Sequence, residues 1–315
     1  MRTVIPVLLA LALGGGAFAA KSPKVPVSPE VQRTFDQVRK TFGSVPGFFK
    51  VLPQSAVEGV WDELKNFDMA ETSIPAKYKS LISLGIASQI PCRYCVIWDT
   101  EAARLGGATD LEIQEAVTLA AVVRKWSTVL NGLQTDEAEF RKEMGPLFSK
   151  EKKEGTPEMA TLPTGPAEAT YKDIHQTLGM LPSFLRNYPE EAVGGAWKVM
   201  KAVQLNPNSA IPSKYKELIG LGISSQIPCK YCTYFHTEAA KFNGATEREV
   251  REAVAIASVT RFWSTALFGM QVDERVFRKE AMDVMKNLKR AMSKTAQMEG
   301  ERTSASSPDE DSSRN

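Results

Sequence analysis

The chain contains two copies of one unit, and this duplication is the feature that most constrains its fold. Residues 74–109 and 211–246 align without a gap at an offset of 137, with 24 identities in 36 positions. Both copies carry I-P-x-K-Y-K-x-L-I-x-L-G-I-x-S-Q-I-P-C-x-Y-C, followed by T-E-A-A and G-A-T. Upstream of residue 211 the offset is 136, so one residue was gained or lost there. A length of 315 residues also suits two domains.

Each copy is predicted to be helical. Thr109-x-x-Glu112 and Thr246-x-x-Glu249 have the spacing of a capping box, a signal for a helix N-terminus. In the second copy, apolar residues follow at helical spacing over 250–259. Neither copy has convincing runs of alternating polar and apolar residues joined by hairpin turns. The expected fold class is therefore all-α, with two tandem helical units.

The N-terminus is predicted to be a secretory signal peptide. Arg2 precedes an apolar run over 4–13, three glycines and a small-residue stretch at 17–20. A membrane anchor needs about 20 consecutive apolar residues, and this run is shorter. No cysteine near the cleavage site could carry a lipid. We expect an exported protein, most simply in a bacterial periplasm, where an oxidising environment surrounds the cysteines.

Composition divides the rest of the chain. A segment rich in Lys, Glu, Pro and Gly separates the two copies, and the C-terminal residues are polar, which predicts a linker and a disordered tail. The predicted boundaries are a signal peptide at 1–19, a first unit at 28–148, a linker at 149–165, a second unit at 166–292 and a tail at 293–315. No later segment is apolar enough to act as a membrane anchor.

Charge and histidine content exclude two kinds of partner. Lys plus Arg number 39 and Asp plus Glu 37, and the net charge of +2 gives no electrostatic reason to expect nucleic acid. The chain has 2 histidines, which excludes a multi-histidine metal cage. We expect neither a metal nor a cofactor.

Two C-x-x-C motifs carry the predicted chemistry, Cys92-x-x-Cys95 and Cys229-x-x-Cys232, each directly after a proline. Proline suits the start of a helix, because it lacks the N–H that would be unsatisfied there. The two cysteines of a pair then share one face near a helix N-terminus, where the exposed N–H groups stabilise a thiolate. Thiol pKa values fall there from about 8.5 to between about 3.5 and 7.5.

A proton relay accompanies the second motif only. His236 lies one turn after Cys232, where an imidazole can take the thiol proton and return it to a leaving group. Glu217, twelve residues before Cys229, could orient that imidazole. The predicted catalytic residues are therefore Cys232, Cys229, His236 and Glu217.

The first motif has lost this relay. Ser80 and Asp99 occupy the positions of the glutamate and the histidine. A carboxylate one turn from Cys95 would disfavour its thiolate by like-charge repulsion. We expect Cys92 and Cys95 to form a redox disulfide in a degenerate site, with a slower thiol and a structural or electron-relay part.

The residues Glu217, Cys229-x-x-Cys232 and His236 resemble the alkylhydroperoxidase AhpD and carboxymuconolactone decarboxylase superfamily. G-x-x-P-x-F upstream and G-A-T-x-x-E downstream also look like that family in both units. The resemblance implies a helical fold that forms trimers or hexamers, with a peroxidase or thiol–disulfide activity. It also implies that Cys232 is the peroxidatic cysteine and Cys229 the resolving one. Members often carry His where this chain has Tyr231, and the decarboxylase branch generally lacks the cysteine pair.

The expected function is a thiol-dependent peroxidase that reduces hydroperoxides and is itself reduced by an external dithiol. One alternative is a thiol–disulfide oxidoreductase without peroxidase activity. Another is a non-catalytic oligomeric scaffold with static disulfides, although a cross-link across three residues removes little loop entropy. A metal bound by the four predicted catalytic residues is a poorer match. Because one duplicated chain can imitate a dimer, we expect a trimer of two-unit chains.

Overall fold

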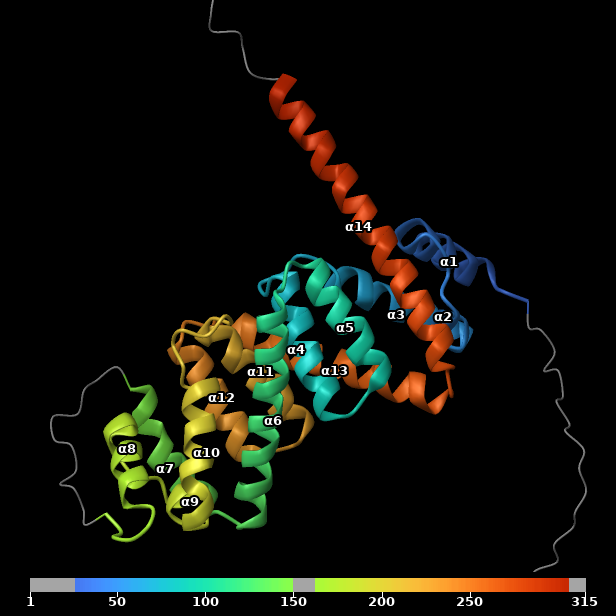
Figure 1. Ribbon diagram of the computed structural model, residues 1–315. Helices are drawn as coiled ribbons and strands as arrows, with labels where there is room; N and C mark the ends of the chain where they lie inside the picture. Colours follow the sequence, from blue (N-terminus) through green and yellow to red (C-terminus); the bar gives the residue numbers. More distant parts are fainter. Residues whose placement is uncertain (1–25, 150–161, 306–315) are drawn as a thin grey trace, which may run out of the picture.

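The computed structural model describes residues 26–149 and 162–305, which form helices and loops without a strand (Figure 1). The expected all-α class is confirmed. The first repeat contains α1 (Pro29–Phe42), α2 (Gly47–Lys50), α3 (Gln54–Glu63), the π-helical turn η1 (Leu64–Asp68), α4 (Ala76–Gln89), α5 (Arg93–Leu105), α6 (Asp110–Gly132), α7 (Glu137–Met144) and the 3₁₀ turn η2 (Gly145–Phe148). The second contains α8 (Glu168–Leu178), α9 (Ser183–Arg186), α10 (Glu190–Val203), α11 (Ser213–Gln226), α12 (Lys230–Phe242), α13 (Glu247–Gly269) and α14 (Glu274–Ala305).

The C-terminal boundary differs from the prediction. Helix α14 continues through Ala305, well past residue 293, where a disordered tail was expected. Residues 286–299 contain no Gly or Pro and are rich in Lys, Met and Ala, which are good helix formers. The polar composition of this segment therefore belongs to an exposed helix. The predicted signal peptide, residues 150–161 of the predicted linker and residues 306–315 lie outside the described residues.

Both predicted capping boxes are present. The Thr109 hydroxyl accepts a hydrogen bond from the backbone N–H of Glu112, and the Glu112 carboxylate accepts one from the N–H of Thr109. Thr246 and Glu249 repeat this arrangement at the start of α13. These caps fix the first turns of α6 and α13, which are equivalent helices of 23 residues each. None of the described helices is long and apolar enough to span a membrane.

Helices α4 and α11 pack against each other at the centre of the contact between the repeats. A Cβ added at Gly85 would lie 3.1 Å from Ile219, and one added at Gly222 would lie 3.0 Å from Ile82, so glycine allows the two helices to approach closely at equivalent positions. Tyr78 and its equivalent Tyr215 stack with ring centroids 3.5 Å apart. Since equivalent residues contact one another in both directions, the repeats are related by an approximate two-fold axis.

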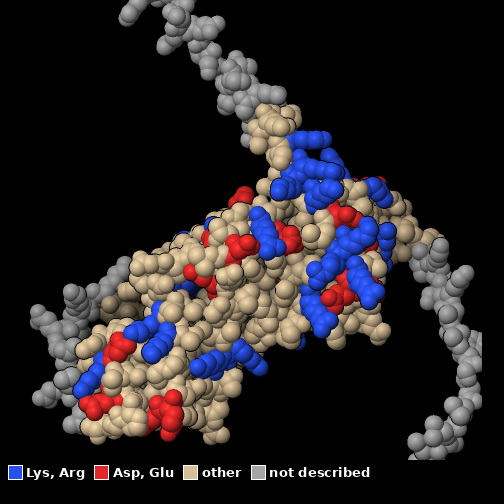
Figure 2. Space-filling view, in the orientation of Figure 1, with Lys and Arg blue, Asp and Glu red and all other residues tan. Residues whose placement is uncertain are grey.

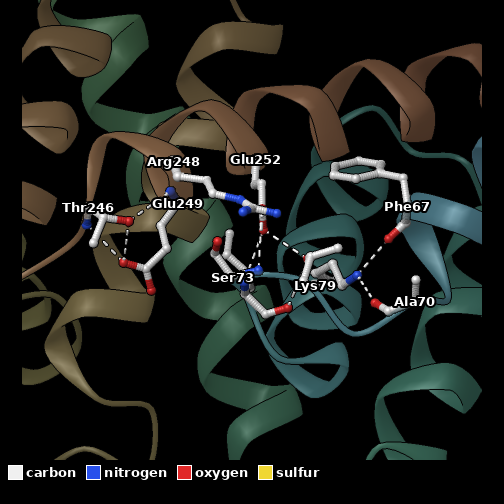
Figure 3. A network of polar contacts seen from close by, with 10 residues as sticks. Phe67, Ala70, Ser73, Lys79, Thr246, Arg248, Glu249 and Glu252 are labelled. Atoms are coloured by element: carbon white, nitrogen blue, oxygen red, sulfur yellow. Dashed lines mark hydrogen bonds and ion pairs between the residues drawn. The ribbon is translucent and has the colours of Figure 1, made fainter.

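Each repeat covers the other with its C-terminal helices. Helices α6 and α7 pack on α10, α11 and α12, whereas α13 and α14 pack on α4 and α5, and α14 also packs on α1 and α2 (Figure 1). Carboxylates join the repeats at equivalent places. Glu252 of α13 accepts hydrogen bonds from the backbone N–H groups of Ser73 and Ile74 (Figure 3), and Glu115 of α6 accepts one from Ile211. The two repeats are therefore interleaved.

Charged side chains of both signs are spread over the body of the molecule. On the face shown in Figure 2, acidic and basic groups lie side by side, and basic groups gather on α14 where it leaves the body. Lys286, Lys289, Arg290 and Lys294 lie in that part of α14.

Candidate active site

A cavity of about 280 Å³ lies against the second cysteine pair. Helix α12 contributes Cys232 and His236 to its wall, and α11 contributes Glu217. The rest of the wall is mostly apolar and comes from both repeats, with Trp126, Leu130 and Phe140 from α6 and α7, and Phe184 and Met200 from α9 and α10. The interleaving therefore closes this cavity with side chains that lie about a hundred residues away in the sequence.

The predicted relay residues are in contact. His236 Nδ1 lies 2.7 Å from Glu217 Oε2, and both side chains are buried. An ionised carboxylate accepts but cannot donate, so Nδ1 is the donor in this contact, and the neutral tautomer that fits it has its lone pair on Nε2. A carboxylate partner on one ring nitrogen thus fixes both the tautomer and the orientation of the ring.

Gly220, which was not among the predicted site residues, makes room for the imidazole. A Cβ added at Gly220 would lie 2.3 Å from His236 Nδ1, closer than such atoms can approach. The first repeat has Ser83 at the equivalent position, where the shorter Asp99 replaces the histidine. The comparison of the two copies therefore carried a signal for this residue, since glycine and histidine occur together in the second copy only.

The second cysteine pair is joined as a disulfide at the start of α12. Cys229 is the N-cap of the helix, and its sulfur accepts a hydrogen bond of 3.2 Å from the backbone N–H of Cys232. Cys229 is fully buried, whereas Cys232 contributes to the cavity wall. The helix terminus thus points one backbone N–H group at the Cys229 sulfur, and Cys232 is the cysteine of the pair that lines the cavity.

Tyr231, between the two cysteines, forms a contact with the first repeat. Its hydroxyl donates a 2.5 Å hydrogen bond to the backbone carbonyl of Thr135, in the loop between α6 and α7. Tyr94, the equivalent residue, donates likewise to Val272 at 2.6 Å. Both tyrosines therefore join the repeats.

Comparison with known proteins agrees with this architecture. The model of the carboxymuconolactone decarboxylase family matches residues 56–137 and 192–275, which together make up more than half of the chain. The chain belongs to the carboxymuconolactone decarboxylase family. A crystal structure from Burkholderia xenovorans LB400, assigned as a gamma-carboxymuconolactone decarboxylase subunit, superposes with a TM-score of 0.55 at 16% identity. The match covers 78% of this chain and 96% of that one, and shows a shared fold. No curated protein matches.

The first repeat of this carboxymuconolactone decarboxylase family chain has an equivalent but smaller cavity of about 50 Å³. Cys92 and Cys95 form a disulfide, with Cys92 as the N-cap of α5 and Cys95 in the cavity wall. Ser80 does not replace the lost relay, because its hydroxyl donates to the Ala76 carbonyl of its own helix at 3.2 Å. Asp99 lies in the cavity wall and is 8% exposed.

Asp99 does not act on Cys95 as a fixed negative charge. Burial, together with the nearby charge of Asp68, raises the pKa of Asp99 well above its usual range, so this carboxyl keeps its proton to higher pH than an ordinary aspartic acid. Like-charge repulsion between Asp99 and a Cys95 thiolate was expected, and it is absent while the carboxyl keeps its proton. Sequence reasoning missed Asp68 itself, whose equivalent in the second cavity is Gln204.

The described residues contain no group of three or more His, Cys, Asp or Glu side chains arranged to hold a metal ion. The second site has one imidazole and one carboxylate, which already bind each other, and two sulfurs that are joined. Its residues are thus arranged for proton transfer next to sulfur.

Proposed function

We propose that the second repeat reduces hydroperoxides with its cysteine pair. The observation that carries this proposal is the juxtaposition of Cys232, His236 and Glu217 at one cavity, with the imidazole already held by the carboxylate. The mostly apolar wall suits an organic hydroperoxide, since most of the side chains that line it are hydrophobic.

The proposed reaction begins with both cysteines reduced. His236 Nε2 takes the proton of the Cys232 thiol, and the thiolate attacks the terminal peroxide oxygen. The O–O bond breaks, its electron pair leaves with the alkoxide, and the imidazolium returns the proton to give an alcohol. Cys232 is then a sulfenic acid, and the Cys229 thiol condenses with it to form the disulfide and water. An external dithiol reduces that disulfide by thiol exchange.

A buried ionisable pair supports an enzyme over a scaffold with static disulfides. Glu217 and His236 lie at 6% and 4% exposure in a mostly apolar wall. Burying such groups is costly, and an apolar pair of similar volume would pack there at no such cost. The first repeat, which has lost both residues, keeps its fold around an equivalent but smaller cavity. The pair is therefore dispensable for folding and is best explained by chemistry.

The proposal also covers where the protein acts, what reduces it and how it assembles. We propose export directed by residues 1–19, an external dithiol as reductant and an assembly of three two-unit chains. The approximate two-fold axis between the repeats supports the last point, because one chain already contains the contact that a dimer of single units would make.

Stopped-flow mixing separates peroxidase from disulfide exchange. The reduced full-length protein is mixed with cumene hydroperoxide in one experiment and with a small-molecule disulfide in another, and tryptophan fluorescence follows the oxidation. We expect faster oxidation by the hydroperoxide, with one alcohol formed for each disulfide. Cys232→Ser is the blank.

Two results would overturn the peroxidase proposal. One is the absence of hydroperoxide consumption by the wild-type protein. The other is an unchanged rate in Cys232→Ser. Rapid oxidation by the small disulfide alone would favour a thiol–disulfide oxidoreductase.

A further inference from the structure

The first cavity is rebuilt with polar groups. Compared with the second cavity, four positions change in the same direction, and the replacements are Asp99 for His236, Asp68 for Gln204, Ser83 for Gly220 and Thr260 for Val123. Each of these four replacements places a carboxyl or a hydroxyl group in the wall around Cys95, while the disulfide is kept. The first cavity lacks the Glu217 carboxylate but holds two acids of its own.

Asp99 has an unused hydrogen-bonding atom in this cavity. Among the described residues, its Oδ2 is buried and has no hydrogen-bond partner. Leaving such an atom unsatisfied in a protein interior is costly, so its persistence requires an explanation. A carboxyl that gives up and takes back a proton during a reaction would supply one.

The two cysteines of the first disulfide line different spaces: Cys95 lines the inner cavity, and Cys92 lines a groove on the surface. The Cys95 sulfur lies 3.9 Å from the Thr260 carbonyl of α13. The groove is also lined by Arg261 and by Phe268, whose side chain is 78% exposed. Cys92 and Cys95 are both buried, at 6% and 5% exposure, but Cys92 borders the groove, whereas its equivalent Cys229 is fully buried. A reductant can thus reach Cys92 while Cys95 faces the acids.

We propose that the first repeat is a second thiol–disulfide exchange site, in which a dithiol attacks Cys92 from the groove and Asp99 protonates Cys95 as the leaving group. The site takes no part in the proposed hydroperoxide chemistry and does not depend on it.

The proposed step balances as an ordinary exchange. A thiolate of the dithiol bonds to the Cys92 sulfur, the Cys92–Cys95 bond breaks, and its electron pair leaves on Cys95. Asp99 gives its proton to Cys95 and regains one from water. The second thiolate of the dithiol then attacks the mixed disulfide and releases Cys92, which takes a proton from solvent. The cysteine pair gains two electrons and two protons, and the dithiol becomes a disulfide.

The charged groups near Asp99 affect its pKa and thereby the pH range in which it can protonate Cys95. Asp68 is the titratable group that acts on it, and burial raises the pKa of Asp68 to about 6, with Lys79 opposing the shift and Glu63 adding to it. Lys79 is held beside this turn by the carbonyls of Phe67 and Ala70 (Figure 3).

The helices that complete the cavity add no further charge. The side chains from α2, α4, α13 and α14 in the wall are aromatic, aliphatic or hydroxyl-bearing. Because its pKa is raised, Asp99 stays protonated to higher pH than an ordinary carboxyl, and it loses this acid function as pH rises through that raised pKa.

The test uses the full chain with Cys229→Ser and Cys232→Ser, so that only the first disulfide reports. Reduction by dithiothreitol is followed through the fluorescence of Trp98 and Trp263, which line the cavity, and rates are divided by the thiolate concentration at each pH. We expect the parent to show a rate that falls at alkaline pH. Asp99→Asn should lower the neutral-pH rate about 100-fold and flatten the profile, because general acids contribute about 10²–10⁴-fold.

Asp68→Asn is the second variant, and it keeps the test decisive if Asp99→Asn folds poorly. Removing the charge of Asp68 should move the alkaline fall to lower pH, a change that a merely structural residue would not cause. The proposal is overturned if the folded parent resists dithiothreitol. It is also overturned if the variants keep the parent's pH profile. Because the second pair is absent, neither result bears on the hydroperoxide proposal.

Discussion

His236→Gln is expected to lower the rate constant for hydroperoxide reduction by about 10²–10⁴-fold, the range that general acid–base catalysis contributes. Glutamine can still occupy the space and bond to Glu217, but it cannot take the Cys232 proton or return it to the alkoxide. The measurement is stopped-flow oxidation of the reduced protein, with thermal unfolding as a check on the fold.

The matched control for His236→Gln is His175→Gln, because His175 is the other histidine of the chain and lies in α8, outside the cavity wall. This control should react at the wild-type rate. A His236→Gln variant that reacts within threefold of wild type would contradict the relay, and the imidazole would then have a packing role.

Gly220→Ala is expected to lower the same rate constant by about 10–100-fold without touching a reacting atom. The added Cβ would lie 2.3 Å from His236 Nδ1, so the ring must move away from its contact with Glu217. Small misplacements of catalytic groups can cost about 100-fold. Alanine also favours the helix by about 1 kcal/mol, which offsets part of an overpacking cost of about 1–3 kcal/mol, so the variant should fold.

Gly195→Ala is the control for this substitution, because a Cβ added there meets nothing within 4 Å. It should leave the rate unchanged and keep or raise the melting temperature. If Gly220→Ala keeps the wild-type rate, the orientation of the imidazole does not matter for the reaction.

The fold class and the relay could be predicted because their signals are local in the sequence. Capping boxes, helical spacing and the C-x-x-C motifs each lie within a few residues. The contact between Glu217 and His236 follows from two adjacent helices joined by a short turn. The duplication then extended each local inference to the other repeat.

The walls of the two cavities could not be predicted in this way. Trp126 and Phe140 cover the second site, and Trp263 and Phe277 cover the first. The reason is that α6 and α7 pack on the second repeat, and α13 and α14 on the first. Nothing in the sequence pattern says which repeat a helix packs on, since an apolar helix face fits either of two similar surfaces. Asp68 was not predicted as a site residue either, because it lies in a short π-helical turn that is far from the cysteines in sequence.

Burial also changes the protonation behaviour that a residue type suggests. At Asp99 the residue type alone indicates a negative charge, but the apolar wall around it favours the neutral acid. Local sequence around the first motif does not reveal that wall, most of which comes from distant helices. The degenerate first site therefore becomes a candidate site with a different proton donor.

The most direct test of the account is to trap the oxidised sulfur. Full-length Cys229→Ser protein is reduced and treated with one equivalent of cumene hydroperoxide and a sulfenic acid trap, and the labelled cysteine is identified by mass spectrometry. The account predicts the label on Cys232, with labelling strongly reduced when His236→Gln is added. Absence of a label on Cys232, or equally fast labelling of Cys95 in a matched Cys92→Ser protein, would contradict it.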